Sequence, residues 1–283
     1  MASVLSDWRA RLGGLGRRSL TAAIVLPLAL LVIWLGGWVW QAWLVLAASL
    51  MAMEWVPLVD GERRALPVLV LALACGALLG QFFVYGGEGL LIFSGAVALA
   101  LLALGWLLCA RSWTLSVGFA YIGAPVLAAA WLRSDAQGAW LMFYIVAAVV
   151  ATDICALVSG RLLGGPKLWP RISPNKTWAG LVGGMAGAAA VSVLFGLAVL
   201  GAPLWLLALL GAALALLAQA GDLLESWLKR LRGVEDSGWL LPGHGGVLDR
   251  VDGLVFALLG MAALALWRGG LTLGPWAALL EGP

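Results

Sequence analysis

Charged and metal-binding side chains are scarce in this sequence of 283 residues. Only 11% of the residues are Asp, Glu, Lys or Arg, there is one His, and the three Cys are scattered through apolar segments. Three scattered Cys form neither a disulfide framework nor a zinc motif, and the lack of Cys/His clusters argues against zinc. The chain also lacks GxxxxGK followed by Ser or Thr, and it has no GxGxxG that opens a helix after a strand. Neither P-loop nor Rossmann nucleotide binding is therefore indicated.

Long apolar segments are abundant instead. Hydrophobic residues make up 63% of the chain, and the mean hydropathy is +1.03. Apolar runs near 20 residues recur, which is the length that crosses a bilayer as a helix. We therefore expect an all-α polytopic integral membrane protein, and the 38 Gly fit close helix packing in lipid. About nine transmembrane helices are predicted, at residues 20–36, 39–56, 66–84, 89–109, 114–132, 138–158, 178–200, 203–224 and 253–268.

The distribution of Lys and Arg predicts the orientation of these segments. With the N-terminus inside, 15 of the 17 Lys and Arg lie on the cytosolic side, and only Arg133 and Arg268 lie outside. Cytoplasmic loops carry an excess of positive residues, so we predict an N-in, C-out topology. A cytosolic basic segment is expected at 1–19, N-terminal transmembrane helices at 20–132, and C-terminal transmembrane helices with candidate catalytic loops at 133–283. Without a long soluble extension, the chain is expected in a bacterial inner membrane.

Polar side chains are concentrated in residues 222–252, which hold four Asp, two Glu, four Lys or Arg and the only His. On a helix, five of them would share one face, with acids at its membrane end and bases at its cytosolic end: Asp222, Glu225, Ser226, Lys229 and Arg230. Such a face can hold a cation beside a phosphate, and a solvated face with ion pairs is the alternative. The following Pro-Gly-His-Gly-Gly run exposes His244 and allows close backbone approach to a ligand at Gly243, Gly245 and Gly246.

Two further acids and a base, Asp249, Arg250 and Asp252, stand at the start of the last long segment. Asp222 and Asp249 lie at the cytosolic ends of consecutive long segments that should pack as neighbours. Mg²⁺ is usually held by one or two carboxylates together with phosphate oxygens and water. We therefore predict that Asp222 and Asp249 bind Mg²⁺ against a triphosphate, with a second cation left open.

A second polar loop, at residues 159–177, is expected on the same side of the membrane. Ser173 is followed by Pro, which favours the start of a helix, so we predict that Ser173 caps the next helix. Lys176 and Thr177 would then lie in its first turn. A helix N-terminus with a nearby Lys is an anion site, although a plain cap explains the same residues.

Two carboxylates lie inside apolar segments, Asp153 and Glu54. A charged side chain there costs roughly 2.5–3.5 kcal/mol on insertion scales, so each is a functional hypothesis by default. We assign Asp153 to the site, with a hydrogen bond to a neighbouring helix as the alternative. For Glu54 a structural role is favoured, because no other polar motif adjoins it in the sequence.

The polar motifs resemble those of one known family. Ser226-x-x-Lys229-Arg230, Glu235-Asp236-Ser-Gly and Pro242-Gly-His-Gly-Gly-x-x-Asp249-Arg250-x-Asp252 resemble the signature of phosphatidate cytidylyltransferases, or CDP-diacylglycerol synthases. Ser173-Pro-x-Lys176-Thr177-Trp178 is similar to the upstream motif of that family. The family usually has Lys where this chain has Glu235, so only Asp236 is carried over from the middle block.

The resemblance implies that CTP and phosphatidic acid react to give CDP-diacylglycerol and pyrophosphate, with Mg²⁺. It also implies an all-helical homodimer in contact with membrane lipids, a polar cleft open to the cytosol, and metal ligation by Asp222 and Asp249. Phosphates would be held by Lys176, Lys229, Arg230 and Arg250, with hydrogen bonds from Ser226 and His244. The other candidate substrate-binding residues are Asp153, Ser173, Thr177, Asp236, Gly243, Gly245, Gly246 and Asp252. No nucleic acid is expected as a partner.

Three other functions stay open. A transporter of a phosphorylated solute would use the same acids and bases. Another lipid head-group transferase, such as a CDP-alcohol phosphotransferase, has a different spaced-Asp motif, which Asp249-Arg-Val-Asp-Gly does not reproduce. A structural membrane protein would have no activity to lose. Release of pyrophosphate with formation of a cytidylylated lipid distinguishes the predicted enzyme from all three.

Overall fold

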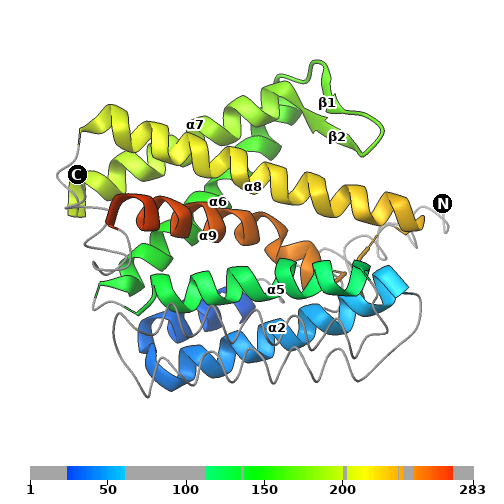
Figure 1. Cartoon of the computed structure of the whole chain (residues 1–283). Coiled ribbons are helices and arrows are strands. Elements are labelled where there is room, and N and C mark those ends of the chain that lie inside the picture. Colours follow the sequence, from blue (N-terminus) through cyan, green and yellow to red (C-terminus); the bar gives the residue numbers. More distant parts are fainter. Residues whose placement is uncertain are drawn as a thin grey trace, which may run out of the picture.

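The computed structural model describes residues 24–60, 113–134, 137–199, 203–234, 236–238 and 245–269. These residues form helices side by side, with one short hairpin at one end of the bundle (Figure 1). The helices are Ile24–Leu35, α2 (Gly37–Asp60), α5 (Trp113–Leu132), α6 (Gly138–Leu162), α7 (Trp178–Val199), α8 (Leu204–Arg232) and α9 (Leu248–Gly269). The hairpin pairs β1 (Lys167–Trp169) with β2 (Ser173–Thr177).

Five of the described helices are long and apolar enough to cross a membrane: Gly37–Val59, Gly138–Leu162, Trp178–Leu197, Leu204–Arg232 and Leu248–Arg268. The apolar helices Ile24–Leu35 and Ala120–Leu132 are shorter. The predicted class, a helical membrane protein, is therefore confirmed. The predicted segments at 66–84 and 89–109 lie outside the described residues, and each of the other predicted segments overlaps a described helix.

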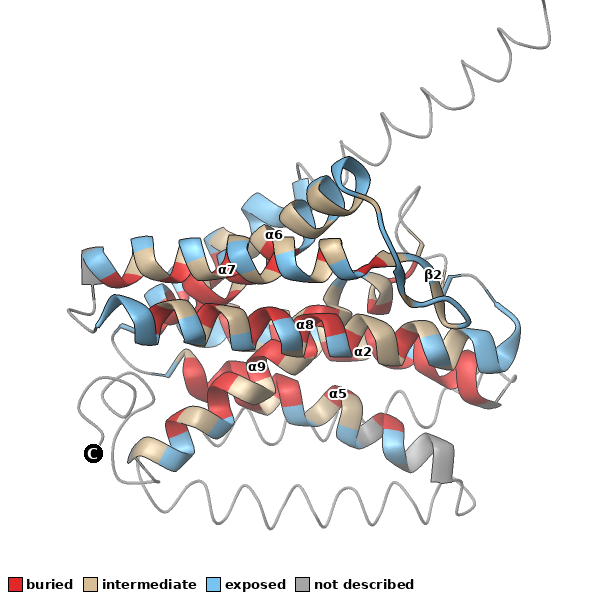
Figure 2. Cartoon of the chain, turned by 90° about the horizontal axis from the view of Figure 1, so that it is seen from above, coloured by how far each residue is buried: buried red, intermediate tan, exposed pale blue. Residues whose placement is uncertain are grey.

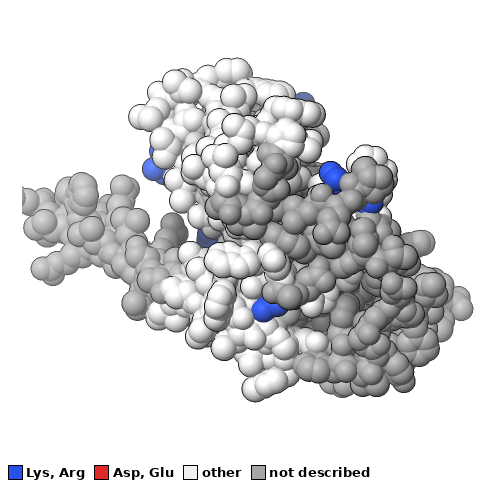
Figure 3. Space-filling view, turned by 90° about the vertical axis from the view of Figure 1, so that its left-hand side faces the viewer, with Lys and Arg blue, Asp and Glu red and all other residues white. Residues whose placement is uncertain are grey.

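Successive helices of the C-terminal part run in opposite directions. α6 packs on α7, α7 on α8, and α8 on α9, while α5 joins α9 to α2. The ends of α6 and α8 therefore meet the starts of α7 and α9 at the end of the bundle that carries the hairpin, which we call the hairpin end. Of the described Lys and Arg, all but Arg133 and Arg268 lie there. Figure 3 views the molecule from the opposite end; among the described residues visible in it, some are basic and none is acidic.

Apolar side chains dominate both the interior of the bundle and much of its described surface. Side chains such as Ile122, Ile145 and Met261 are fully buried. Figure 2 shows the buried positions mainly on the helix faces that meet one another. Large apolar side chains such as Leu194 and Trp205 are exposed on the outward faces. Contact of such a surface with water is unfavourable, whereas contact with lipid tails, which are as apolar as Leu, is not. The distribution of exposed residues therefore agrees with the membrane assignment.

Glycines bring α6 and α7 into close contact along what we call the glycine seam. A Cβ on Gly183 would collide with Ser159, and one on Gly187 would collide with Cys155. Small residues let helix backbones approach closely in lipid, where van der Waals packing drives association. Cys155 is a free thiol inside this seam, in line with a packing role.

The start of α7 differs from the prediction. Ser173 does not cap a helix, because it opens β2, whose register with β1 pairs Trp169 with Ser173 and Lys167 with Thr177. The capping group is Thr177, whose Oγ1 accepts a hydrogen bond of 3.0 Å from the N–H of Gly180. Thr177 offers a good cap oxygen immediately before the helix, and strand pairing engages the backbone upstream of it. Lys176 therefore precedes the helix, rather than lying in its first turn.

Helix α8 is longer than its apolar segment, which was predicted to end at residue 224. It continues to Arg232 and ends at Gly233, whose φ of 68° is the left-handed conformation that favours glycine at this position. The N–H of Val234 donates to the carbonyl of Lys229 at 3.1 Å and completes the cap. The hydropathy of a segment indicates how many residues lie in lipid, and a helix can continue beyond them. The polar face of residues 222–230 is thus the continuation of the same helix that forms the apolar segment at 203–224.

Candidate active site

The site forms where α8 and α9 cross at the hairpin end. A Cβ on Gly221 would collide with the carbonyl oxygen of Asp252, and one on Gly253 would lie 3.3 Å from the carbonyl oxygen of Ala218. The two backbones therefore touch, which only small residues permit. As a result Asp222, the next residue along α8, lies beside the first turn of α9.

Asp222 connects α8 to the segment that precedes α7. Its Oδ2 lies 2.6 Å from the Nζ of Lys176, and its Oδ1 accepts a hydrogen bond of 3.2 Å from the Oγ of Ser226. Asp153 of α6 joins the same region through electrostatic interactions with Asp222, Lys176 and Arg250. Residues from both predicted polar loops are thus brought together with a carboxylate from inside an apolar helix.

Asp249 forms the second ion pair of the site. Its Oδ1 lies 2.6 Å from the Nζ of Lys229, and its Oδ2 accepts hydrogen bonds from the N–H groups of Gly246 at 2.8 Å and Ser237 at 3.1 Å. The Asp249 side chain is only 7% exposed. A carboxylate that leaves water needs such charge-assisted hydrogen bonds. Asp249 is therefore fixed by one cation and by two backbone groups of the loop before α9.

Among the residues that the structure describes, the site contains more acids than bases. Glu225 is 1% exposed and lies 3.6 Å from the Nζ of Lys229, with Asp249 and Asp252 as further electrostatic neighbours. We call five groups the carboxylate cluster: Asp153, Asp222, Glu225, Asp249 and Asp252. The bases that interact with them are Lys176, Lys229 and Arg250. With every group ionised, five acids and three bases leave a net charge of −2, which is costly in a partly buried site unless protons or a cation bind.

The carboxylate cluster fits the predicted Mg²⁺. Among the described residues, no three His, Cys, Asp or Glu side chains are grouped so as to hold a metal ion by themselves. Mg²⁺ does not require such a cage, because it is usually held by one or two carboxylates with substrate phosphates and water. The excess of carboxylate oxygens over cationic partners is the property of this site that fits a divalent cation.

Glu54 of α2 reaches the same region from the N-terminal part of the chain. Its carboxylate is 3% exposed and accepts hydrogen bonds of 2.9 Å from the N–H groups of both Val247 and Leu248. It thereby satisfies free N–H groups at the start of α9. A structural role was expected for Glu54 because no polar motif adjoins it in the sequence; in space, however, it contacts the polar segment at the start of α9.

The remaining predicted residues differ in whether the structure places them beside the carboxylate cluster. Gly245 has a φ of 80°, and a Cβ on it would lie 3.0 Å from Asp249 Oδ2 and 3.2 Å from Asp236 Oδ1, so Asp236 is part of the site. The Nε of Arg230 donates to the carbonyl of Ile172 at 3.4 Å and ties α8 to the hairpin. His244, Gly243 and Glu235 lie outside the described residues.

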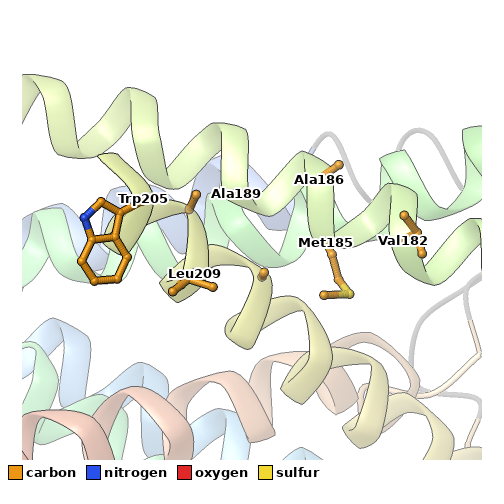
Figure 4. Close-up of a pocket in the computed structure, with 8 residues that line it drawn as sticks. Val182, Met185, Ala186, Ala189, Trp205 and Leu209 are labelled. Atoms are coloured by element: carbon orange, nitrogen blue, oxygen red, sulfur yellow. The ribbon is translucent and has the colours of Figure 1, made fainter. Parts of the chain in front are cut away.

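An apolar groove separate from this site lies between α7 and α8 (Figure 4). Its volume is about 580 Å³, and its lining includes Val182, Met185, Ala186, Ala189, Trp205 and Leu209. None of the predicted site residues lines it. The groove therefore supplies no polar or charged side chain to the site at the hairpin end.

Sequence reasoning missed two contributions to the site. Ser237 was not singled out, although its N–H donates to Asp249 and its Oγ donates to Glu54 at 3.4 Å. The burial of Glu225 was also missed, because an amphipathic face on a helix resembles a solvated one. For Glu54 the available signal was its place inside an apolar segment, which marks an ionisable residue for attention.

Fold and site together define a helical membrane protein with a charge-dense, oxygen-rich site at one end. The model of the "Cytidylyltransferase family" matches residues 16–267, and the chain belongs to this family. A phosphatidate cytidylyltransferase of Brucella suis biovar 1 is 38% identical over 258 residues, which cover 87% of this chain and 91% of that protein. A phosphatidate cytidylyltransferase of Staphylococcus epidermidis is 33% identical over 251 residues, which cover 85% and 95%. The resemblance drawn from the polar motifs is thus confirmed.

Proposed function

We propose that this protein transfers the cytidylyl group of CTP to phosphatidic acid, giving CDP-diacylglycerol and pyrophosphate. The similarity to phosphatidate cytidylyltransferases over most of the chain supports this activity. The observation that carries it in the structure is the carboxylate cluster, flanked by Lys176 and Lys229, at the end of an apolar bundle. Such a site suits a water-soluble triphosphate and a phosphate head group whose acyl chains stay in lipid.

The reaction needs no protein base. An oxygen of the lipid phosphate attacks the α-phosphorus of CTP, a new P–O bond forms, and the bond to the β-phosphate breaks, so that pyrophosphate leaves with the electron pair. A phosphate monoester has a second pKa near 6 and is largely dianionic at neutral pH. The work of the protein is therefore to position the two phosphates and to stabilise the charge that develops between them.

Four bases and two hydrogen-bond donors are assigned to the phosphates. Lys176 and Lys229 each contact a carboxylate at 2.6 Å, and an ammonium group with three donors can contact a phosphate oxygen as well. Arg230, Arg250, Ser226 and His244 complete the set. Asp153, Asp236, Asp252 and the Gly-rich turn with Gly243, Gly245 and Gly246 line the substrates in this proposal. Ser173 and Thr177 hold the hairpin and the start of α7 beside them.

Asp222 and Asp249 are the carboxylates proposed to hold Mg²⁺. When bound, the ion would neutralise charge on the phosphate oxygens and on the leaving pyrophosphate. Asp252 interacts electrostatically with Asp222 and would add negative charge beside the ion. One Mg²⁺ would balance the net charge of −2 on the cluster, so a second cation would be balanced by the phosphates of the substrates.

The membrane arrangement that we propose has nine transmembrane helices, with the N-terminus and the active site facing the cytosol of a bacterial inner membrane. The support is the gathering of Lys and Arg at the hairpin end, because cytoplasmic loops carry an excess of these residues. CTP is a cytosolic solute, so this orientation gives it access. A homodimer, with phosphatidic acid reaching the site laterally from the bilayer, completes the proposal.

One assay tests the function. Purified protein is incubated with CTP, phosphatidic acid and Mg²⁺, and pyrophosphate and a cytidylylated lipid are measured in equal amounts. The matched control is Asp249→Asn, which keeps the size of the side chain and removes its charge. Correctly folded wild-type protein that forms no lipid product would overturn the proposal, and solute flux in proteoliposomes without pyrophosphate would replace it with a transporter.

A further inference from the structure

Two glycines leave the space that the Glu54 carboxylate occupies. A Cβ on Gly238 would lie 2.6 Å from the Glu54 Cδ, and one on Gly246 would lie 2.5 Å from its Oε2. Two described segments between α8 and α9, residues 236–238 and 245–247, thus lie directly against a side chain of α2. We use the name loop before α9 for these two segments alone. The closeness of these contacts means that any larger residue at either position would displace the carboxylate or the loop.

The same loop bonds to Asp249 on its other side. Ser237 donates from its N–H to Asp249 and from its Oγ to Glu54. Gly246 donates to Asp249, and the next residue, Val247, donates to Glu54. The loop is therefore held between two carboxylates, one proposed to act in the chemistry and one buried in a transmembrane helix.

Helix packing alone does not explain a carboxylate at position 54. A charged group in an apolar helix is unfavourable, and an apolar residue would pack α2 against α9 without that penalty. What Glu54 provides is two oxygens that accept backbone N–H groups at the start of α9, immediately before Asp249. The contact therefore sets where the first turn of α9, and with it the Asp249 side chain, lies relative to Lys229.

We propose that Glu54 is a positioning residue for the cytidylyl transfer: it touches neither substrate, but it fixes the loop before α9 so that Asp249 is held in its working place. This inference rests on the proposed function. It gives a role in the chemistry to a residue of the N-terminal helices, whereas the residues assigned to the phosphates and the metal all come from positions 153–252.

The test compares Glu54→Gln with Tyr144→Phe. The Gln amide keeps the shape but turns a donor toward one of the two backbone N–H groups, so one hydrogen bond is lost and two donors oppose each other. The control, Tyr144→Phe, removes a buried hydrogen bond of 2.8 Å to Ser192 that lies between α6 and α7, outside the site. We expect Glu54→Gln to lower kcat roughly 10- to 100-fold with KM for CTP and lipid changed less than about threefold, and Tyr144→Phe to leave kcat per folded molecule unchanged.

A second readout does not depend on activity. Hydrogen exchange of at least one of the backbone amides of Val247 and Leu248 should accelerate in Glu54→Gln, because one of the two loses its acceptor, and both should keep the wild-type rate in Tyr144→Phe. Combining Glu54→Gln with Asp249→Asn should cost no more activity than Asp249→Asn alone, because the two residues act through the same loop. If Glu54→Gln does not fold, Ser237→Ala replaces it, with an expected kcat loss of roughly two- to fivefold for the weaker contact.

Several results would overturn the proposal. The first is a wild-type kcat in folded Glu54→Gln, and the second is an equal loss of kcat in Tyr144→Phe at the same stability. The third is unchanged hydrogen exchange of the Val247 and Leu248 amides in Glu54→Gln. The fourth is a double variant, Glu54→Gln with Asp249→Asn, whose loss of activity is the product of the two single losses. If the wild-type protein itself forms no cytidylylated lipid, the proposed function fails, whereas the exchange measurement still decides whether Glu54 holds the loop.

Discussion

The glycine seam between α6 and α7 and the crossing of α8 and α9 are both built from glycines that press against a neighbouring helix. In the seam, Gly183 and Gly187 face the side chains of Ser159 and Cys155. At the crossing, Gly221 faces the backbone oxygen of Asp252. The first contact brings uncharged surfaces together, whereas the second brings carboxylates together. Close packing at glycines thus holds two helices together in the seam, whereas at the crossing it positions the charged side chains of the site.

This difference leads to different expectations for substitutions. When a methyl group is added to Gly187, Cys155 can turn its Sγ away, but its Cβ, at 2.8 Å, moves only with α6, so the two helices of the seam must shift slightly. At the crossing, the added methyl group meets a backbone carbonyl oxygen that moves only with α9. Changes in the seam should therefore alter stability and leave the chemistry of folded molecules intact. Changes at the crossing should separate Asp222 from α9 and reduce turnover, even in molecules that fold.

The largest effect is expected from removing a carboxylate of the crossing. Asp249→Ala or Asp222→Ala should lower turnover at least 100-fold, or about 2.7 kcal/mol of barrier, because each is proposed to bind Mg²⁺. Initial rates of pyrophosphate release, with circular dichroism to verify folding, measure this. A residual rate above about one tenth, less than about 1.4 kcal/mol, would remove that residue from the metal site.

Paired glycine substitutions test the comparison directly. Gly221→Ala should lower kcat at least tenfold, because its Cβ would collide with the Asp252 carbonyl and force α8 and α9 apart. Gly187→Ala should lower the melting temperature but keep kcat per folded molecule, because its Cβ would meet the Cys155 side chain. Equal loss of kcat in both variants would mean that the two contacts do not differ in their effect on the chemistry.

A smaller effect is expected for the base at the edge of the crossing. Lys176→Met removes the ammonium group 2.6 Å from Asp222 and should raise KM for CTP or for phosphatidic acid roughly tenfold. The Lys176 ion pair joins the hairpin to α8, so the seam should be unaffected and the melting temperature should change little. Steady-state kinetics with each substrate varied in turn measure the effect, and Lys167→Met on the same hairpin is the matched control.

The smallest effect is expected at position 235, where the family resemblance fails. If position 235 is peripheral to both the seam and the crossing, Glu235→Lys should change kcat and KM less than about twofold, because substitutions away from such contacts usually have small effects. Side-by-side kinetics of the two proteins test this. A large gain in rate would instead indicate that Glu235 limits this enzyme and that a phosphate contact is missing there.

Much of the architecture was predictable because hydropathy and helix length act locally. The segments at 138–158 and 178–200 coincide with α6 and α7 for this reason, and the shared face of residues 222–230 followed from helical periodicity alone. The hairpin was not predictable in the same way. Two strands of three and five residues carry almost no periodic signal, so Ser173 was assigned to a helix that starts later.

Contacts between distant parts of the chain could not be predicted from the sequence either. The partners of Glu54 are separated from it by 193 and 194 positions, and no local pattern connects an apolar segment to a Gly-rich loop that far away. The sequence predicted that the two polar loops lie on the same side of the membrane, but it did not predict that Lys176 pairs with Asp222. Which acid meets which base depends on helix packing, in this protein on the contact of Gly221 with Asp252.

The contact of Glu54 with the loop before α9 also has a consequence for biosynthesis. α2 emerges from the ribosome and enters the bilayer long before residues 237–248 are translated, so its carboxyl group lacks these N–H partners until then. An ionisable group without partners is unfavourable in lipid. Insertion of α9 therefore removes a free-energy penalty that has been present since α2 was inserted. A chain truncated before α9 would keep an unpartnered carboxyl group in the bilayer, which membrane quality control can recognise.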